Sequence, residues 1–115
     1  MDAKTLEALQ ASIEKWERNA VAETPDEYRT GSDNCPLCNL FIEDRCAGCP
    51  VKARSGSGYC LRTPYMVAHD AKIFWHTGTG TARQARKAAR AEVAFLKSLL
   101  PTDAALSRSQ ADEGR

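Results

Sequence analysis

The sequence predicts a mainly α-helical fold in which an N-terminal and a C-terminal helix pack as an antiparallel pair around an irregular, cysteine-ligated metal-binding module. Three observations predict it. Apolar residues recur at helical spacing near the start of the chain and again near its end. Between these segments, five cysteines lie from position 35 to position 60, among glycines and prolines. The length of 115 residues is that of one domain.

We divide the chain into a single domain, residues 1–101, and a flexible polar tail, residues 102–115. The domain has five predicted parts: a helix (1–21), an acidic connector (22–34), the metal-binding module (35–64), an apolar connector (65–80) and a second helix (81–100). The chain starts without the apolar stretch of a signal peptide, and no run of about 18 apolar residues suggests a membrane span. We therefore expect a soluble cytoplasmic protein.

The N-terminal helix is predicted from one apolar stripe. Its residues recur at steps of three and four, and they are Leu6, Leu9, Ile13, Trp16 and Ala20. Asp2 is suited to cap the helix. A helix of this length is marginal on its own in water, so the stripe has to bury against another element.

The C-terminal helix has clear start and stop signals. Thr81 and Gln84 have the spacing of a capping box, and Pro101 ends the helix after Leu100. Its apolar stripe consists of Ala85, Ala89, Val93, Leu96 and Leu100. We expect this stripe to pack against the stripe of the N-terminal helix. Residues 65–80 are apolar but show no period that assigns a structure.

The cysteines have the pattern of a metal site. Two CxxC pairs, Cys35/Cys38 and Cys46/Cys49, each form a two-ligand clamp, and four thiolates make a closed tetrahedral zinc site. The predicted ligands are therefore Cys35, Cys38, Cys46 and Cys49, with Cys60 as a substitute for one of them. A continuous helix over residues 36–44 would be about 13 Å long and would separate the pairs. The segment between them must therefore turn back.

Alternatives to zinc remain open. In the reducing cytoplasm, cysteines in CxxC pairs bind metal more often than they form disulfides. Cys49-Pro50 is also typical of iron–sulfur cluster sites, which would give the protein an electron-transfer or enzymatic role. No catalytic residues are identified, so a binding module is favoured over an enzyme. We expect His69 and His76 to be hydrogen-bonded or surface side chains.

Charge is distributed unevenly along the chain. Residues 22–44 hold six acidic residues and one arginine, whereas residues 72–97 hold six basic residues and one glutamate. Five basic residues of the C-terminal helix form a predicted basic face: Arg83, Arg86, Lys87, Arg90 and Lys97. This face has the residues to bind nucleic acid phosphates. Alternatively, it pairs with the acidic connector, and the partner is another protein.

Several motifs occur together in this chain: Cys35-Pro36-Leu37-Cys38, Cys46-Ala47-Gly48-Cys49-Pro50-Val51, Cys60 with Thr63-Pro64-Tyr65, Trp16-Glu17 and the late Phe95-Leu96-Lys97-Ser98-Leu99-Leu100-Pro101. This combination resembles a family of small, uncharacterised cysteine-rich proteins of bacteriophages and prophages. The resemblance implies a phage or prophage origin, hence the host cytoplasm, and a cysteine site that includes Cys60. It implies no activity.

Overall fold

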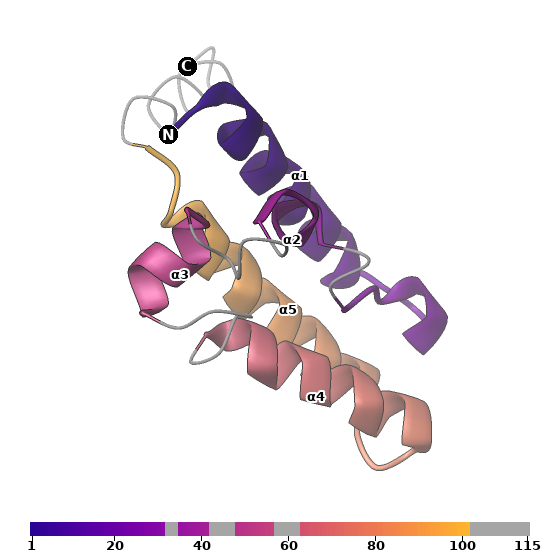
Figure 1. The fold of residues 1–115 in the computed structure, drawn as a ribbon. Coiled ribbons are helices and arrows are strands. Elements are labelled where there is room, and N and C mark those ends of the chain that lie inside the picture. The colour runs from indigo at the N-terminus through magenta and orange to yellow at the C-terminus, as the bar shows by residue number, and fades with distance from the viewer. Residues whose placement is uncertain (32–34, 42–47, 57–62, 102–115) are drawn as a thin grey trace.

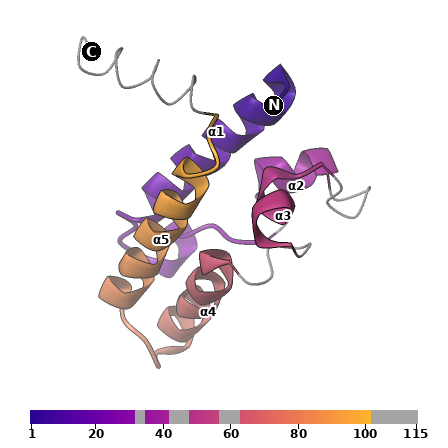
Figure 2. The same ribbon diagram turned by 90° about the vertical axis from the view of Figure 1, so that its left-hand side faces the viewer.

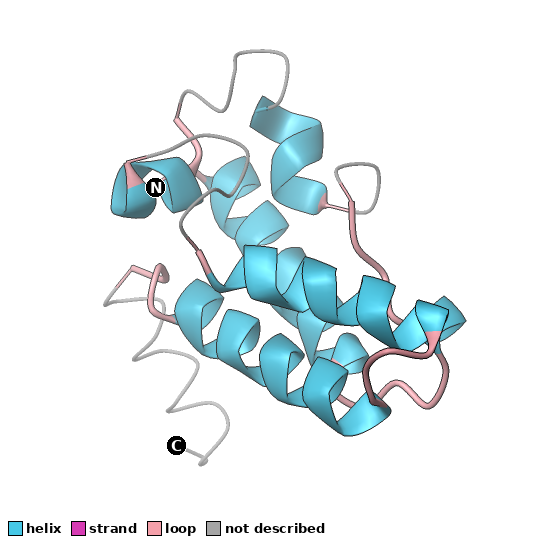
Figure 3. Cartoon of the chain, turned by 90° about the horizontal axis from the view of Figure 1, so that it is seen from below, coloured by secondary structure: helices cyan, strands magenta, loops and turns pink. Residues whose placement is uncertain are grey.

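The computed structural model describes residues 1–31, 35–41, 48–56 and 63–101. These residues contain five α-helices, one short 3-10 turn and no strand, which confirms the mainly α fold class (Figure 3). The elements are α1 (Ala3–Asn19), η1 (Pro25–Glu27), α2 (Pro36–Phe41), α3 (Pro50–Ser55), α4 (Pro64–Thr77) and α5 (Ala82–Lys97). None of the helices in these ranges has the length and apolar character needed to cross a membrane. The predicted tail lies outside the described residues.

Helices α1 and α5 lie side by side and run in opposite directions, as predicted (Figure 1). Two hydrogen bonds fix the start of α5 to the segment that follows α1. The Tyr28 hydroxyl donates to the Ala85 carbonyl at 2.8 Å, and Arg86 Nε donates to the Ala22 carbonyl at 3.0 Å. The apolar stripes of both helices are buried in one core cluster, which contains Leu9, Ile13, Trp16, Ala85, Ala89 and Leu96.

Both predicted caps are present. The Asp2 carboxylate accepts a hydrogen bond from the Thr5 backbone N–H at 2.8 Å. Thr81 and Gln84 form the reciprocal capping box of α5. The caps satisfy backbone groups that the first turn of a helix leaves without partners. They therefore define where the two long helices begin.

Helix α4 occupies most of the segment that the sequence leaves as an apolar connector. It starts at Pro64, with Thr63 as its N-cap, and ends at Gly78, which adopts the left-handed conformation with φ +84°. A tight turn then leads into α5, and the two helices pack as an antiparallel hairpin (Figure 1). The core is therefore a three-helix arrangement of α1, α4 and α5 rather than a helix pair.

Aromatic side chains connect α1, the segment that follows it and α4. Trp16 of α1 makes edge-to-face contacts with Tyr28 and with Tyr65 of α4, with ring centroids 5.7 Å and 5.9 Å apart. Tyr28 makes a third such contact with Trp75 at 6.2 Å. Edge-to-face geometry is a preferred arrangement of aromatic pairs. Tyr28 belongs to the predicted acidic connector, yet its side chain is wholly buried.

The cysteine-rich segment contains two short helices, α2 and α3, on one side of the α1–α5 pair (Figure 2). Pro36 suits the first position of a helix and so predicts a short helical turn after Cys35, with Leu37, Leu40 and Phe41 on its buried face. Helix α2 confirms the turn, and Leu37 is buried, whereas Leu40 is exposed. The second helix, α3, contradicts the expectation of irregular backbone after Cys49.

Candidate metal centre

Cys35 and Cys49 occupy equivalent positions in two similar turns. Each precedes a proline that begins a six-residue helix. Proline suits the first helical position because its φ is fixed near the helical value, and it holds the preceding residue in an extended conformation. Cys49 has that conformation, with φ −68° and ψ 128°. Two residues after each cysteine, Leu37 and Val51 are buried and anchor the turns in the core.

The two cysteines line the same small cavity of about 20 Å³. One wall comes from α2 and α3, and the opposite walls come from α1, α4 and α5. The lining residues outside the two turns are Ser12, Lys15, Trp16, Tyr65, Glu92 and Leu96. This volume suits one water-sized species or a single ion. The cavity therefore brings together one cysteine from each CxxC pair.

The sulfur of Cys35 is surrounded by groups that stabilise a thiolate. The Cys38 backbone N–H donates to Cys35 Sγ at 3.2 Å. A hydrogen bond from the Cys38 side chain is the main cause that lowers the pKa of Cys35 to about 6, with further help from backbone N–H groups and the Lys15 ammonium, while burial opposes the change. The thiolate is the form of cysteine that binds metal. Cys35 and Cys38 therefore have the local geometry of a ligand pair.

On the α5 side of the cavity, Glu92 is a buried carboxyl group. Only 3% of the residue is exposed, and within the described part of the chain Glu92 Oε1 has no hydrogen-bond partner. Burial raises the pKa of Glu92 to about 8, the nearby Cys35 adds to this effect, and Lys15 opposes it. The buried hydroxyl of Ser12 also lacks a partner among these residues. The cavity is thus lined by two cysteines and by the polar side chains of Ser12, Lys15 and Glu92.

Gly48 brings the chain back to the end of α2, as a site shared by the two pairs requires. Helix α2 is described as far as Phe41, and residues 42–47 lie outside the described residues. Gly48, with φ +85°, returns to the ring of Phe41, where an added Cβ would lie 3.3 Å from Phe41 Cε1. A side chain at this position would be strained by the backbone and crowded by the ring. Gly48 therefore allows the second pair to return to the first.

Two of the proposed ligands cannot be placed. Cys46 and the substitute Cys60 lie outside the described residues. Within the described ranges, no three His, Cys, Asp or Glu side chains converge as a metal site. His69 stacks on Tyr65 with ring centroids 5.7 Å apart, and His76 is exposed at the end of α4.

Sequence reasoning missed the three polar residues of the cavity wall: Ser12, Lys15 and Glu92. In the sequence, Glu92 is the single acidic residue among the basic residues of the C-terminal helix, which suggests a surface position. The available signal was its spacing, because it follows Ala85 by seven residues and Ala89 by three and so lies on the apolar stripe. Lys15 is buried although it is charged, and its ammonium lies 4.9 Å from the ring centroid of Trp16.

The basic face of α5 is mostly exposed. Arg83, Lys87, Arg90 and Lys97 are exposed, and among the described residues the first three form no ion pair. Lys97 pairs with Glu17 of α1 at 3.4 Å. Arg86 differs from the others because it is half-buried and bonds the Ala22 carbonyl. The described part of the acidic connector therefore does not neutralise this face.

Comparison of the chain with protein-family models, with curated proteins and with solved structures gives no match.

Proposed function

We propose that the protein is a zinc-stabilised, zinc-finger-like binding module. In this proposal, Cys35, Cys38, Cys46 and Cys49 hold one zinc ion, and Cys60 is the substitute for one of them. The observation that carries the proposal is that Cys35 and Cys49, from different CxxC pairs, line one buried cavity. Two clamps that are far apart in the fold would not do so.

Zinc would supply a tetrahedral link between four thiolates and no redox chemistry. The link has a clear structural purpose here. Helices α2 and α3 have only six residues each, and helices this short are unstable without tertiary support. A metal bound by Cys35 and Cys49, which directly precede α2 and α3, would hold both helices against the α1–α5 pair. The alternative is an iron–sulfur cluster, which cysteines of this pattern can also hold.

We also propose that the partner is a protein or a nucleic acid. The exposed basic face supports nucleic acid, because three of its cations have no ion-pair partner in the described ranges. The resemblance of the cysteine motifs to those of phage and prophage proteins is the basis for proposing an origin in a phage or prophage. The interaction would then take place in the host cytoplasm.

Metal analysis of protein purified under reducing conditions tests the zinc proposal. We expect about one zinc per chain and a colourless solution. Cys49→Ser should lose zinc, whereas His76→Ser, at an exposed histidine far from the cavity, should retain it. Protein without stoichiometric metal would refute the proposal. A brown solution containing iron would instead establish the cluster.

A further inference from the structure

The outer side of α4 is an exposed apolar face. Met66, Val67, Ile73 and Phe74 are 36%, 65%, 46% and 51% exposed. They are four of the seven large apolar residues that are exposed in the described part of the chain. Isolated exposed apolar residues are common, but a contiguous group on one helix face marks an interaction site.

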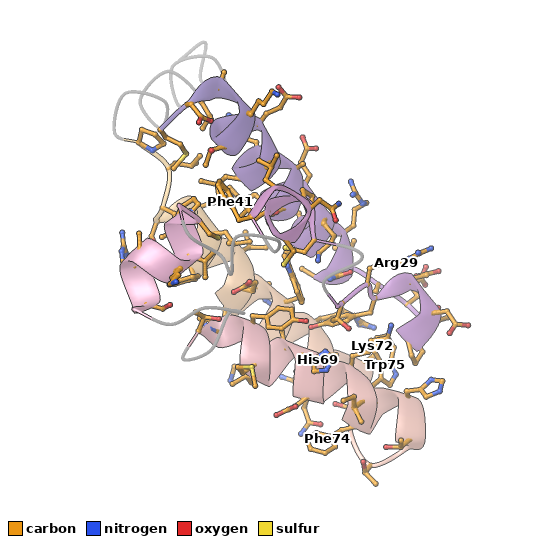
Figure 4. All side chains as sticks on the ribbon, viewed as in Figure 1. Arg29, Phe41, His69, Lys72, Phe74 and Trp75 are labelled. Carbon is orange, nitrogen blue, oxygen red and sulfur yellow. The ribbon has the colours of Figure 1, made fainter. Side chains whose placement is uncertain are left out.

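Helix α4 is apolar on two sides, and only one of them is needed for the fold. Ala68 on the inner side is wholly buried, and Tyr65 and Trp75 contact the aromatic core. Figure 4 shows Trp75 on the side of α4 towards the rest of the molecule and Phe74 on the opposite, outer side. The outer apolar side is therefore not explained by the packing of the described residues.

One carboxylate lies at the centre of the apolar face. Asp70 follows Met66 by four residues and Val67 by three, and it precedes Ile73 by three and Phe74 by four. These are the spacings at which side chains are neighbours on a helix surface. Asp70 is exposed and has no ion pair in the described ranges. The face therefore consists of two apolar pairs with a negative charge between them.

The backbone of Phe74, the largest residue of this face, is held by the turn into α5. The Phe74 carbonyl accepts hydrogen bonds from the backbone N–H groups of Thr79 and Gly80, both at 2.8 Å. Gly80 packs so closely that an added Cβ would lie 2.8 Å from Phe74 Cβ. The turn into α5 thus fixes the backbone of Phe74. An exposed aromatic residue on a fixed backbone suits an anchor of an interface, because no backbone freedom is lost there on binding.

We infer that the outer face of α4 docks an amphipathic helix of another protein, whose apolar side carries one arginine or lysine opposite Asp70. The charge argues against a second copy of this chain, because a two-fold contact through this face would bring two Asp70 carboxylates together. It argues equally against a lipid surface, since the carboxylate would enter the apolar layer. A basic residue flanked by apolar residues on the partner helix complements both the charge of Asp70 and the apolar residues around it. This inference rests on the proposed binding role but not on the metal.

A pair of designed peptides tests the inference on the purified 115-residue chain. Both are amphipathic helices of about 15 residues with a leucine stripe, interrupted at its centre by arginine in one and by glutamate in the other. We expect the arginine peptide to bind about tenfold more tightly. Phe74→Ser should weaken its binding about tenfold or more, as loss of an anchor does. Asp70→Lys should reverse the preference between the peptides.

Val21→Ser is the matched control, because Val21 is 71% exposed and lies outside the α4 face. It should bind the arginine peptide like the wild type. Failure of the wild type to bind either peptide, equal binding of both, or binding that survives Phe74→Ser would overturn the inference. So would self-association of the wild type that Phe74→Ser abolishes. Zinc content is measured on the same samples, so failure of the docking inference is separate from failure of the zinc proposal.

Discussion

Replacing Glu92 by glutamine is expected to make the free energy of unfolding less sensitive to rising pH. Burial raises the pKa of Glu92 from an ordinary 4.5 to about 8. The folded protein therefore holds this proton more tightly than the unfolded chain does. The stability contributed by protonated Glu92 is complete below about pH 4.5 and is lost as the pH rises towards about 8. Glutamine has a similar shape and does not ionise, so Glu92→Gln should not show this loss.

The magnitude follows from the width of the pH window. Each pH unit between the two pKa values removes about 1.4 kcal/mol from the free energy of unfolding. From about pH 6 to about pH 8, the wild type should therefore lose about 2 kcal/mol relative to Glu92→Gln. Burial is the main cause of the raised pKa.

Urea unfolding of both proteins, at several pH values and with zinc present, measures the difference. Changes common to both, including the pH dependence of thiolate binding to zinc, cancel in the comparison. Glu14→Gln, at an exposed glutamate of α1, is the control and should follow the wild type. A difference between wild type and Glu92→Gln that stays constant over this range would refute the reasoning. Loss of zinc from Glu92→Gln would instead identify the carboxylate as a ligand.

Three further predictions concern the core, the α4–α5 turn and the basic face. Tyr28→Phe should lower the free energy of unfolding by about 1–2 kcal/mol, because a buried hydrogen bond to a carbonyl of α5 is lost; an unchanged urea midpoint would contradict this. Gly80→Ala should lower it by about 1–3 kcal/mol, because the new Cβ would lie 2.8 Å from Phe74 Cβ, and a melting temperature equal to that of the wild type would show that the turn adapts. If the basic face binds nucleic acid, Arg83→Glu with Arg90→Glu should weaken binding to mixed DNA in low salt and flatten its salt dependence without loss of stability; undetectable binding by the wild type would leave a protein partner.

The long helices at the two ends of the chain could be predicted because each has one apolar stripe. The stripes of α1 and α5 are regular, and Asp2 and Thr81 mark where the helices start. Helix α4 could not be recognised in the same way. Its inner side packs in the core and its outer side carries Phe74 and other apolar residues, so no single period stands out. The exposed apolar face makes α4 hard to recognise in the sequence, and the same face indicates a binding partner.

The candidate metal centre was predictable only as far as its local motifs. The CxxC spacing identifies the clamps, and Pro36 indicates the helical turn after Cys35. The meeting of Cys35 with Cys49 depends on the return of the chain at Gly48, and the presence of Lys15 and Glu92 depends on how α1 and α5 pack. Charged residues are rarely buried, so a sequence-based prediction assigns Lys15 and Glu92 to the surface even though the spacing of Glu92 places it on the apolar stripe.

Cobalt(II) titration of the metal-free protein tests the central claim, a four-thiolate site built from both CxxC pairs, most directly. Cobalt takes the place of zinc and, unlike zinc, absorbs visible light according to the geometry and ligands of its site. We expect one equivalent to give the intense bands of tetrahedral cobalt with thiolate ligands, and one equivalent of zinc to remove them. Cys35→Ser and Cys49→Ser should each weaken the thiolate bands. The weak spectrum of six-coordinate cobalt, or bands that survive both substitutions unchanged, would contradict the claim.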